Sequence, residues 1–216
     1  MSRKARKYQT KKSLIFHVIN RGILKQDIFH DEDDFSCFKS LLKKYSLKES
    51  LKIYHWCIMS NHYHVVLEIS DPERISKVVG GWQQVYALRY HKKYNTAGKL
   101  FQGRFKSQAI DDGRYLLACG RYVEQNPIRA GVCRNLDDWK WSSANFYIKN
   151  KTDGLTSQNP YFNFSQDKSY DYSEELESLF KSSADIIGSK EFSSQLIKVE
   201  GRPAKRKRGR RPELII

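Results

Sequence analysis

The sequence predicts an α+β domain with a ferredoxin-like split βαβ arrangement, an antiparallel sheet and one additional helix toward its C-terminal side. Four short segments have the apolar patterning of strands, and three longer ones have the spacing of helices. Their order along the chain is β-α-β-β-α-β-α, which is the split βαβ order with one helix added. A chain of 216 residues is long enough for one such core and an appendage.

The four expected strands are short and rich in β-branched and aromatic residues. The second and third are joined by the brief Ser60-Asn61 connection, which favours an antiparallel hairpin. In chain order the expected strands are 13–22, 51–60, 61–70 and 100–110.

The three expected helices have clear sequence signals. Residues 31–50 begin with acidic side chains, which suit a helix N-terminus, and apolar residues follow at three-and-four spacing. Residues 72–95 are mostly helical in pattern, and Gly80-Gly81 predicts a break or kink there. Residues 111–126 form the third helix, which we expect to stop at Asn126 because Pro127 disfavours helical geometry in the residue before it.

The composition changes after about residue 148. We therefore expect the main folded domain over residues 1–148, a linker or irregular segment over 149–172, and a short helical segment over 173–197. Residues 198–216 form a basic tail.

Basic residues are concentrated at the two ends of the chain, which has a net charge of +15. Residues 1–12 carry six basic and no acidic groups, and residues 198–216 carry eight basic and two acidic groups. Arginine, glycine and proline alternate in the stretch "GRPAKRKRGRRP", a composition suited to lying along a phosphate backbone. We expect the tail to contact nucleic acid through Lys205, Arg206, Arg208, Arg210 and Arg211.

Cysteine spacing and hydropathy indicate a protein of a reducing compartment. The four cysteines include no CxxC pair, and the chain has no secretory signal. No apolar stretch approaches the roughly 18 residues that a membrane span needs. These features predict a cytoplasmic protein, and nucleic-acid contact would associate it with the nucleoid.

Two histidines lie two positions apart in the third expected strand, within "SNHYHVVLE". Strand side chains alternate between faces, so His62, His64 and Glu68 share one face. Two such imidazoles can meet one cation, although they also fit as ordinary sheet residues with local hydrogen bonds. A third ligand must come from elsewhere. On the third helix Tyr122 and Asn126 are four residues apart, so they share one helix face.

Five stretches in order carry a resemblance to a known family: "FHVINRG", "KQDIFHDEDDF", "WCIMSNHYHVVLE", "LFQGRFKSQAID" and "YVEQNPIRAGVC". They resemble the HUH-type single-tyrosine transposases (IS200-like), most closely the REP-associated tyrosine transposase group. The resemblance implies metal binding by His62 and His64 and a nucleophilic tyrosine at Tyr122. Relatives in the insertion-sequence branch carry a glutamine ligand four residues after the nucleophile, where this chain has Asn126. Gln125 is the alternative third ligand.

The resemblance also implies a reaction and its partners. The chain would nick and rejoin single-stranded or hairpin DNA through a 5′-phosphotyrosine, with Mn²⁺ or Mg²⁺ as the divalent cation and Zn²⁺ as the next choice. It would act as a monomer or a homodimer. Arg21, Arg104 and Lys106, beside Phe101 and Phe105, are candidates for DNA contact. The alternatives are a non-catalytic nucleic-acid-binding protein and a metal-dependent phosphodiesterase that uses water.

Overall fold

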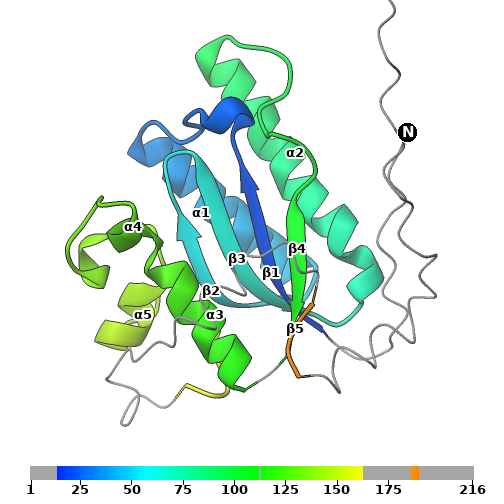
Figure 1. The fold of residues 1–216 in the computed structure, drawn as a ribbon. Helices are drawn as coiled ribbons and strands as arrows, with labels where there is room; N and C mark the ends of the chain where they lie inside the picture. The colour runs from blue at the N-terminus through cyan, green and yellow to red at the C-terminus, as the bar shows by residue number, and fades with distance from the viewer. Residues whose placement is uncertain (1–13, 112, 163–185, 190–216) are drawn as a thin grey trace, which may run out of the picture.

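A computed structural model describes the fold of residues 14–111, 113–162 and 186–189. Within these residues a sheet is covered by helices on both faces (Figure 1). The main elements in chain order are β1 (Leu14–Arg21), α1 (Glu32–Lys48), β2 (Lys52–Ile58), β3 (His62–Ile69), α2 (Ile75–Tyr94), β4 (Lys106–Ile110), α3 (Arg114–Glu124), α4 (Asn126–Arg129), α5 (Ala144–Lys149) and β5 (Ile186–Ile187).

The strand order across the sheet is β2-β3-β1-β4-β5. The first four strands pair antiparallel, and the two-residue β5 adds a short parallel edge beside β4. The expected α+β split βαβ fold with an antiparallel sheet is confirmed. Two segments differ from the sequence expectation. The regular part of β4 begins at Lys106 instead of residue 100, and β5 lies within the segment expected to be helical.

Helices α1 and α2 cover one face of the sheet. The predicted apolar positions Phe35, Phe38 and Leu42 are buried there against strand residues such as Val65. Asp31 caps α1 by accepting a hydrogen bond from the backbone N–H of Asp34, which uses one of the unpaired donors of the first turn. This face holds the large aromatic core, to which the central strands β1 and β3 both contribute side chains.

Helix α2 continues through Gly80-Gly81, so the expected break or kink is wrong. At Gly81 the helix lies directly against α1, because a Cβ there would be 2.7 Å from the hydroxyl of Tyr45. Glycine therefore serves the close approach of two helices and does not interrupt α2. The helix ends at Asn95, whose left-handed backbone (φ 50°) is a common helix terminus.

Helix α3 covers the opposite face of the sheet (Figure 1). Its buried side chains, including Leu116, Cys119 and Val123, pack on Val66 and Ile110 of the strands. Helix α3 stops at Glu124, two residues before the expected end, and Asn126 begins the short helix α4. The expectation that Pro127 excludes Asn126 from helical geometry is therefore wrong, because proline is tolerated in the first turn of a helix.

The chain after α5 packs onto β2. Residues 150–162 have an irregular backbone, yet Leu155 is buried in the aromatic core and Asn159 is fully buried. The side chain of Asn159 contacts Nε2 of His55 at 2.9 Å, and the opposite ring nitrogen of His55 contacts Glu124 at 2.9 Å. These contacts connect the end of α3 to the sheet. The basic stretches 1–12 and 198–216 lie outside the described residues.

Candidate active site

Strand β3 places His62 and His64 on the face that α3 covers. In the register of the sheet His62 lies opposite Arg21 and His64 lies opposite Ile19, both in β1. The two imidazole rings have centroids 5.1 Å apart and stand almost perpendicular, at 79°. His64 is buried and His62 is half-buried, so the pair faces solvent through His62. Glu68 lies farther along β3, where it accepts a hydrogen bond from Tyr54.

The end of α3 brings Tyr122 and Asn126 to these histidines. The ring of Tyr122 stands edge-on to His64, with centroids 5.9 Å apart. The side-chain amide of Asn126 donates to the backbone carbonyls of Tyr122 (2.9 Å) and Val123 (3.1 Å). Because its N–H groups point into the helix end, the carbonyl oxygen is the part that can reach His62, and an Asn126 hydrogen bond acts on the pKa of that ring.

Burial keeps both histidines neutral at ordinary pH. The pKa of His64 lies well below its usual value, mainly because of burial, and electrostatic interactions with His17, His62 and Arg129 lower it further. Burial also lowers the pKa of His62; a hydrogen bond to the side chain of Asn126 opposes this shift, and the charge of Arg21 adds to it. Neutral imidazole is the form that ligates metal, so protons compete little with a cation here.

Gln125, the alternative third ligand, is engaged elsewhere. Its side-chain oxygen accepts a hydrogen bond from Nη2 of Arg129 at 2.8 Å. The donor set that comes together is thus two imidazole nitrogens and the amide oxygen of Asn126. Imidazole suits Mn²⁺ and other transition metals, whereas an amide oxygen suits Mn²⁺ and Mg²⁺, so the residues present fit a divalent cation.

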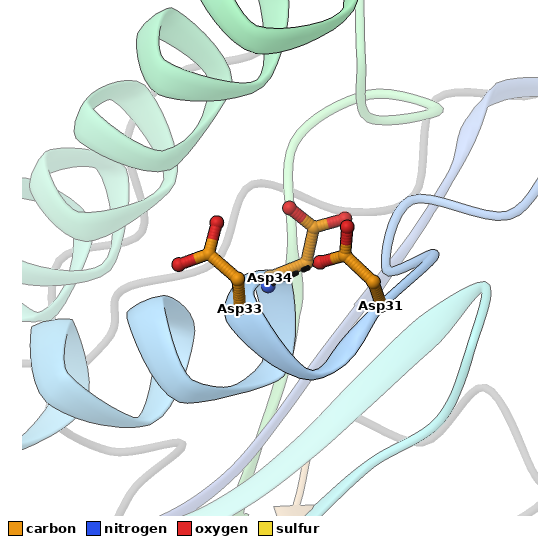
Figure 2. A group of neighbouring side chains, drawn as sticks. All are labelled: Asp31, Asp33 and Asp34. Atoms are coloured by element: carbon orange, nitrogen blue, oxygen red, sulfur yellow. Dashed lines mark hydrogen bonds between the residues drawn. The ribbon is translucent and has the colours of Figure 1, made fainter.

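Three carboxylates on the α1 side, from Asp31, Asp33 and Asp34, form a second cluster of potential ligands (Figure 2). The ammonium group of Lys93 lies 2.7 Å from Asp31, 3.1 Å from Asp33 and 2.9 Å from Asp34. Arg89 adds a contact of 3.1 Å to Asp34. Two protein cations, Lys93 and Arg89, already lie against these three carboxylates, so the cluster joins α1 to α2 and gives no reason to place a metal there.

Two residues near the tyrosine were not predicted from the sequence. His17 of β1 contacts His64, with 2.8 Å between its Nε2 and Nδ1 of His64. The guanidinium of Arg129 lies over the ring of Tyr122 at 4.7 Å and donates to the Tyr122 carbonyl at 3.1 Å. The alternation of "LIFHVINR" places His17 on one face of its strand. Only the register of β1 against β3 shows that this is the face that carries His62 and His64.

The expected DNA-contacting residues of the domain lie at the same end of the sheet. Arg21 and Lys106 occupy the α3 face, since Arg21 pairs with His62 and Lys106 pairs with Ile19 in the same register. Arg104 is exposed just before β4. Arg21 is oriented by a hydrogen bond from its Nε to Gln102.

The two phenylalanines expected beside these DNA-contacting residues differ in their exposure to solvent. Phe101 is only 9 % exposed and packs in the core, so it is not available to stack on a base, whereas Phe105 is half-buried. The tail residues lie outside the described residues, and these are Lys205, Arg206, Arg208, Arg210 and Arg211.

An antiparallel sheet with a His-x-His pair on a central strand, faced by a helix that carries a tyrosine, is the arrangement of an HUH-type single-tyrosine transposase. The family model described as "Transposase IS200 like" matches residues 10–126, which is more than half of the chain. The chain belongs to this family of DNA transposases, whose members generally depend on a divalent metal.

A solved structure shows the same fold. A REP-associated tyrosine transposase bound to a REP hairpin is 16 % identical, with a TM-score of 0.54, and the match covers 76 % of this chain and 96 % of that one. A protein of Deinococcus radiodurans R1 is 15 % identical with a TM-score of 0.40, covering 63 % of this chain and 97 % of that one. No curated protein matches the chain. Among the described residues, no helix is long and apolar enough to cross a membrane.

Proposed function

We propose that the chain nicks single-stranded DNA and transfers the strand through a 5′-phosphotyrosine on Tyr122, with a divalent cation held by His62, His64 and Asn126. One observation carries the proposal. A single helix end presents Tyr122 against His64 and Asn126 toward His62, so the hydroxyl of a tyrosine and three potential ligands share one site. A nucleophile must lie within a few ångströms of the reacting phosphate, and this juxtaposition supports such a role for Tyr122.

The reaction balances without an external energy source. The Tyr122 oxygen forms a bond to phosphorus while the bond from phosphorus to the 3′-oxygen breaks, and the proton of the phenol ends on the departing 3′-hydroxyl. The aryl phosphate keeps the bond energy, so a second 3′-hydroxyl can attack and release the tyrosine. A bound divalent cation supplies Lewis-acid polarisation of the phosphate oxygens.

Basic side chains around the site suit a phosphodiester. The charge of Arg21 acts on His62, the charge of Arg129 acts on His64, and Lys106 is exposed on the same face. Arg129 also lies over the Tyr122 ring, which places a positive charge next to the side chain that attacks. We assign these residues to phosphate contact, because charged contacts to phosphate fix the position of the strand without reading its sequence.

Hairpin-bearing DNA is the proposed substrate. The REP-associated transposase of the same fold is bound to a REP hairpin, and the basic ends of this chain supply additional charge for a folded strand. The proposed place of action is the nucleoid, with the protein working as a monomer or a homodimer.

A denaturing gel tests the proposal. Labelled hairpin DNA is incubated with the protein and Mn²⁺ or Mg²⁺, and a covalent protein–DNA adduct is the expected product. Cut DNA without an adduct would support hydrolysis by water instead, and bound but uncut DNA would support a binding protein. Both of these outcomes contradict strand transfer.

A matched pair of variants identifies the nucleophile. Tyr122→Phe removes only a hydroxyl, so it should abolish the adduct and leave DNA binding nearly intact. Tyr115 lies seven residues earlier on α3, roughly 10 Å along the helix axis, and its hydroxyl contacts Arg114 at 3.1 Å. Tyr115→Phe should leave adduct formation unchanged, and peptide mapping that finds DNA on Tyr115 would refute the assignment.

A further inference from the structure

Three buried polar side chains form a hydrogen-bonded row across the face of the sheet beneath α3. Gln108 of β4, His17 of β1 and His64 of β3 are 6 %, 1 % and 2 % exposed. The side-chain oxygen of Gln108 lies 3.0 Å from Nδ1 of His17, and Nε2 of His17 lies 2.8 Å from Nδ1 of His64. The row thus crosses three strands and ends at a proposed metal ligand.

With His17 neutral, the two contacts of the row give a consistent order of donors and acceptors. An amide oxygen can only accept, so Nδ1 of His17 carries the proton and donates to Gln108. In a neutral His17 the Nε2 atom is then an acceptor, so Nδ1 of His64 must donate to it. The remaining nitrogen of His64, Nε2, keeps its lone pair. In the opposite tautomer Nε2 would carry a hydrogen and could not ligate a cation.

The second histidine of the pair has the same arrangement. Nδ1 of His62 lies 2.6 Å from the side-chain oxygen of Asn61, so this nitrogen also donates and Nε2 keeps its lone pair. Two histidines on one strand therefore present the same nitrogen. Each is oriented by a different neighbour, and the neighbour of His64 is itself oriented by Gln108.

We propose that His17 and Gln108 are positioning residues that fix His64 in the tautomer with a proton on Nδ1 and direct Nε2 toward the cation. The inference rests on the proposed function, because it takes His64 as a metal ligand. Metal-ligating histidines commonly donate their other ring nitrogen to a neighbouring acceptor, and loss of that acceptor typically weakens metal binding about 10- to 100-fold.

The rest of the same face argues against stability as the reason for this row. Val66, Ile110 and Cys119 fill the neighbouring part of the α3 interface with apolar side chains. Desolvating three polar groups is costly, and buried polar groups can often be replaced by apolar ones of similar volume without loss of stability. A row that ends on a ligand is better explained by the orientation it gives to that ligand.

The first test compares His17→Phe with His17→Gln. Phenylalanine keeps a ring but cannot accept a hydrogen bond, whereas the glutamine side chain offers an oxygen to Nδ1 of His64. Two quantities are measured: the tautomer of His64 by nitrogen-detected NMR in metal-free protein, and the affinity for Mn²⁺ by titration calorimetry. In wild-type protein we expect the proton on Nδ1. His17→Phe should shift it toward Nε2 and weaken Mn²⁺ binding by about 10- to 100-fold, and His17→Gln should recover most of both.

A second pair tests the other end of the row and guards against a variant that fails to fold. Gln108→Leu removes the acceptor for His17 and should reproduce the His17→Phe result, while Gln108→Glu keeps an acceptor and should behave like wild type. Thermal denaturation of each variant separates folding from positioning. A proton on Nε2 of His64 in wild type, or unchanged Mn²⁺ affinity in folded His17→Phe and Gln108→Leu, overturns the inference. If the wild type binds no Mn²⁺ at all, the cation site of the proposed function is wrong instead.

Discussion

Replacing Gly120 with alanine tests how firmly α3 is held against the sheet. Gly120 is buried in α3 directly over the ring of His55, and a Cβ added there would lie 2.6 Å from Cδ2 of that ring and closer to two other ring atoms. The ring cannot move away easily. One of its nitrogens contacts Glu124 and the other contacts Asn159, each at 2.9 Å.

The expected size of the effect follows from two opposing contributions. Alanine in place of glycine favours a helix by about 1 kcal/mol. Against this, forcing a methyl group into a filled site typically costs about 1–3 kcal/mol, and displacing His55 from a buried hydrogen bond costs a further 1–3 kcal/mol or so. Together these contributions predict that Gly120→Ala lowers the free energy of unfolding by about 1–5 kcal/mol.

Gly80→Ala is the matched control. Gly80 also lies within a helix, but nothing is within 4 Å of a Cβ added there, so this variant should gain about 1 kcal/mol. Urea denaturation of both variants measures the difference. Because α3 also carries Tyr122, Gly120→Ala should slow adduct formation while the protein remains folded, and Gly80→Ala should not. If Gly120→Ala is stabilised as much as Gly80→Ala, α3 does not pack on His55 as described.

Three further predictions concern separate parts of the chain. Burial raises the pKa of Asp34, but hydrogen bonds led by the one from Lys93 bring it down to about 2 from 3.8, so its contribution to stability is complete above about pH 4 and is lost as pH falls toward 2. Urea denaturation should therefore show Asp34→Asn less stable than wild type by about 1–2 kcal/mol at neutral pH. This difference in stability should disappear as the pH falls to about 2. Asn126→Asp keeps an oxygen ligand but loses the amide donors at the end of α3, so it should lower the melting temperature and retain Mn²⁺ binding in calorimetry. Asn126→Ala removes both the ligand and the donors, so it should lower the melting temperature and also weaken Mn²⁺ binding. Removing residues 198–216 should weaken DNA binding and flatten its salt dependence by about 0.7 log unit per lost phosphate contact on single strands, and an unchanged slope would argue against tail binding.

Local sequence patterns were sufficient for most of the secondary structure. The acidic start and the apolar spacing of residues 31–50 predicted α1, because both signals act within one or two helical turns. Gly80-Gly81 was misleading for a physical reason. The cost of glycine in a helix is local, whereas the use of Gly81 depends on the approach of Tyr45, which is 36 positions earlier in the chain.

In the candidate site, too, local features could be predicted from the sequence and long-range contacts could not. His62 and His64 share a face by strand alternation alone, and Tyr122 and Asn126 share a helix side by spacing alone, so each pair could be found in the sequence. That the two pairs meet depends on the packing of α3 on β3. The row from Gln108 through His17 to His64 was not accessible at all, because its members are joined only by the register of three strands.

The end of α3 explains how one short segment can position several groups at once. A helix terminus leaves its last backbone carbonyls without partners within the helix. Here the carbonyl of Tyr122 accepts from both Asn126 and Arg129, so the side chains that satisfy the helix end are the same ones that lie beside the histidines and the tyrosine ring. Because the short helix α4 begins at Asn126 in place of a loop, the side chains of Asn126 and Arg129 return toward Tyr122. The geometry of the site is therefore tied to the termination of the helix, and a change that alters how α3 ends should disturb the tyrosine, the amide and the arginine together.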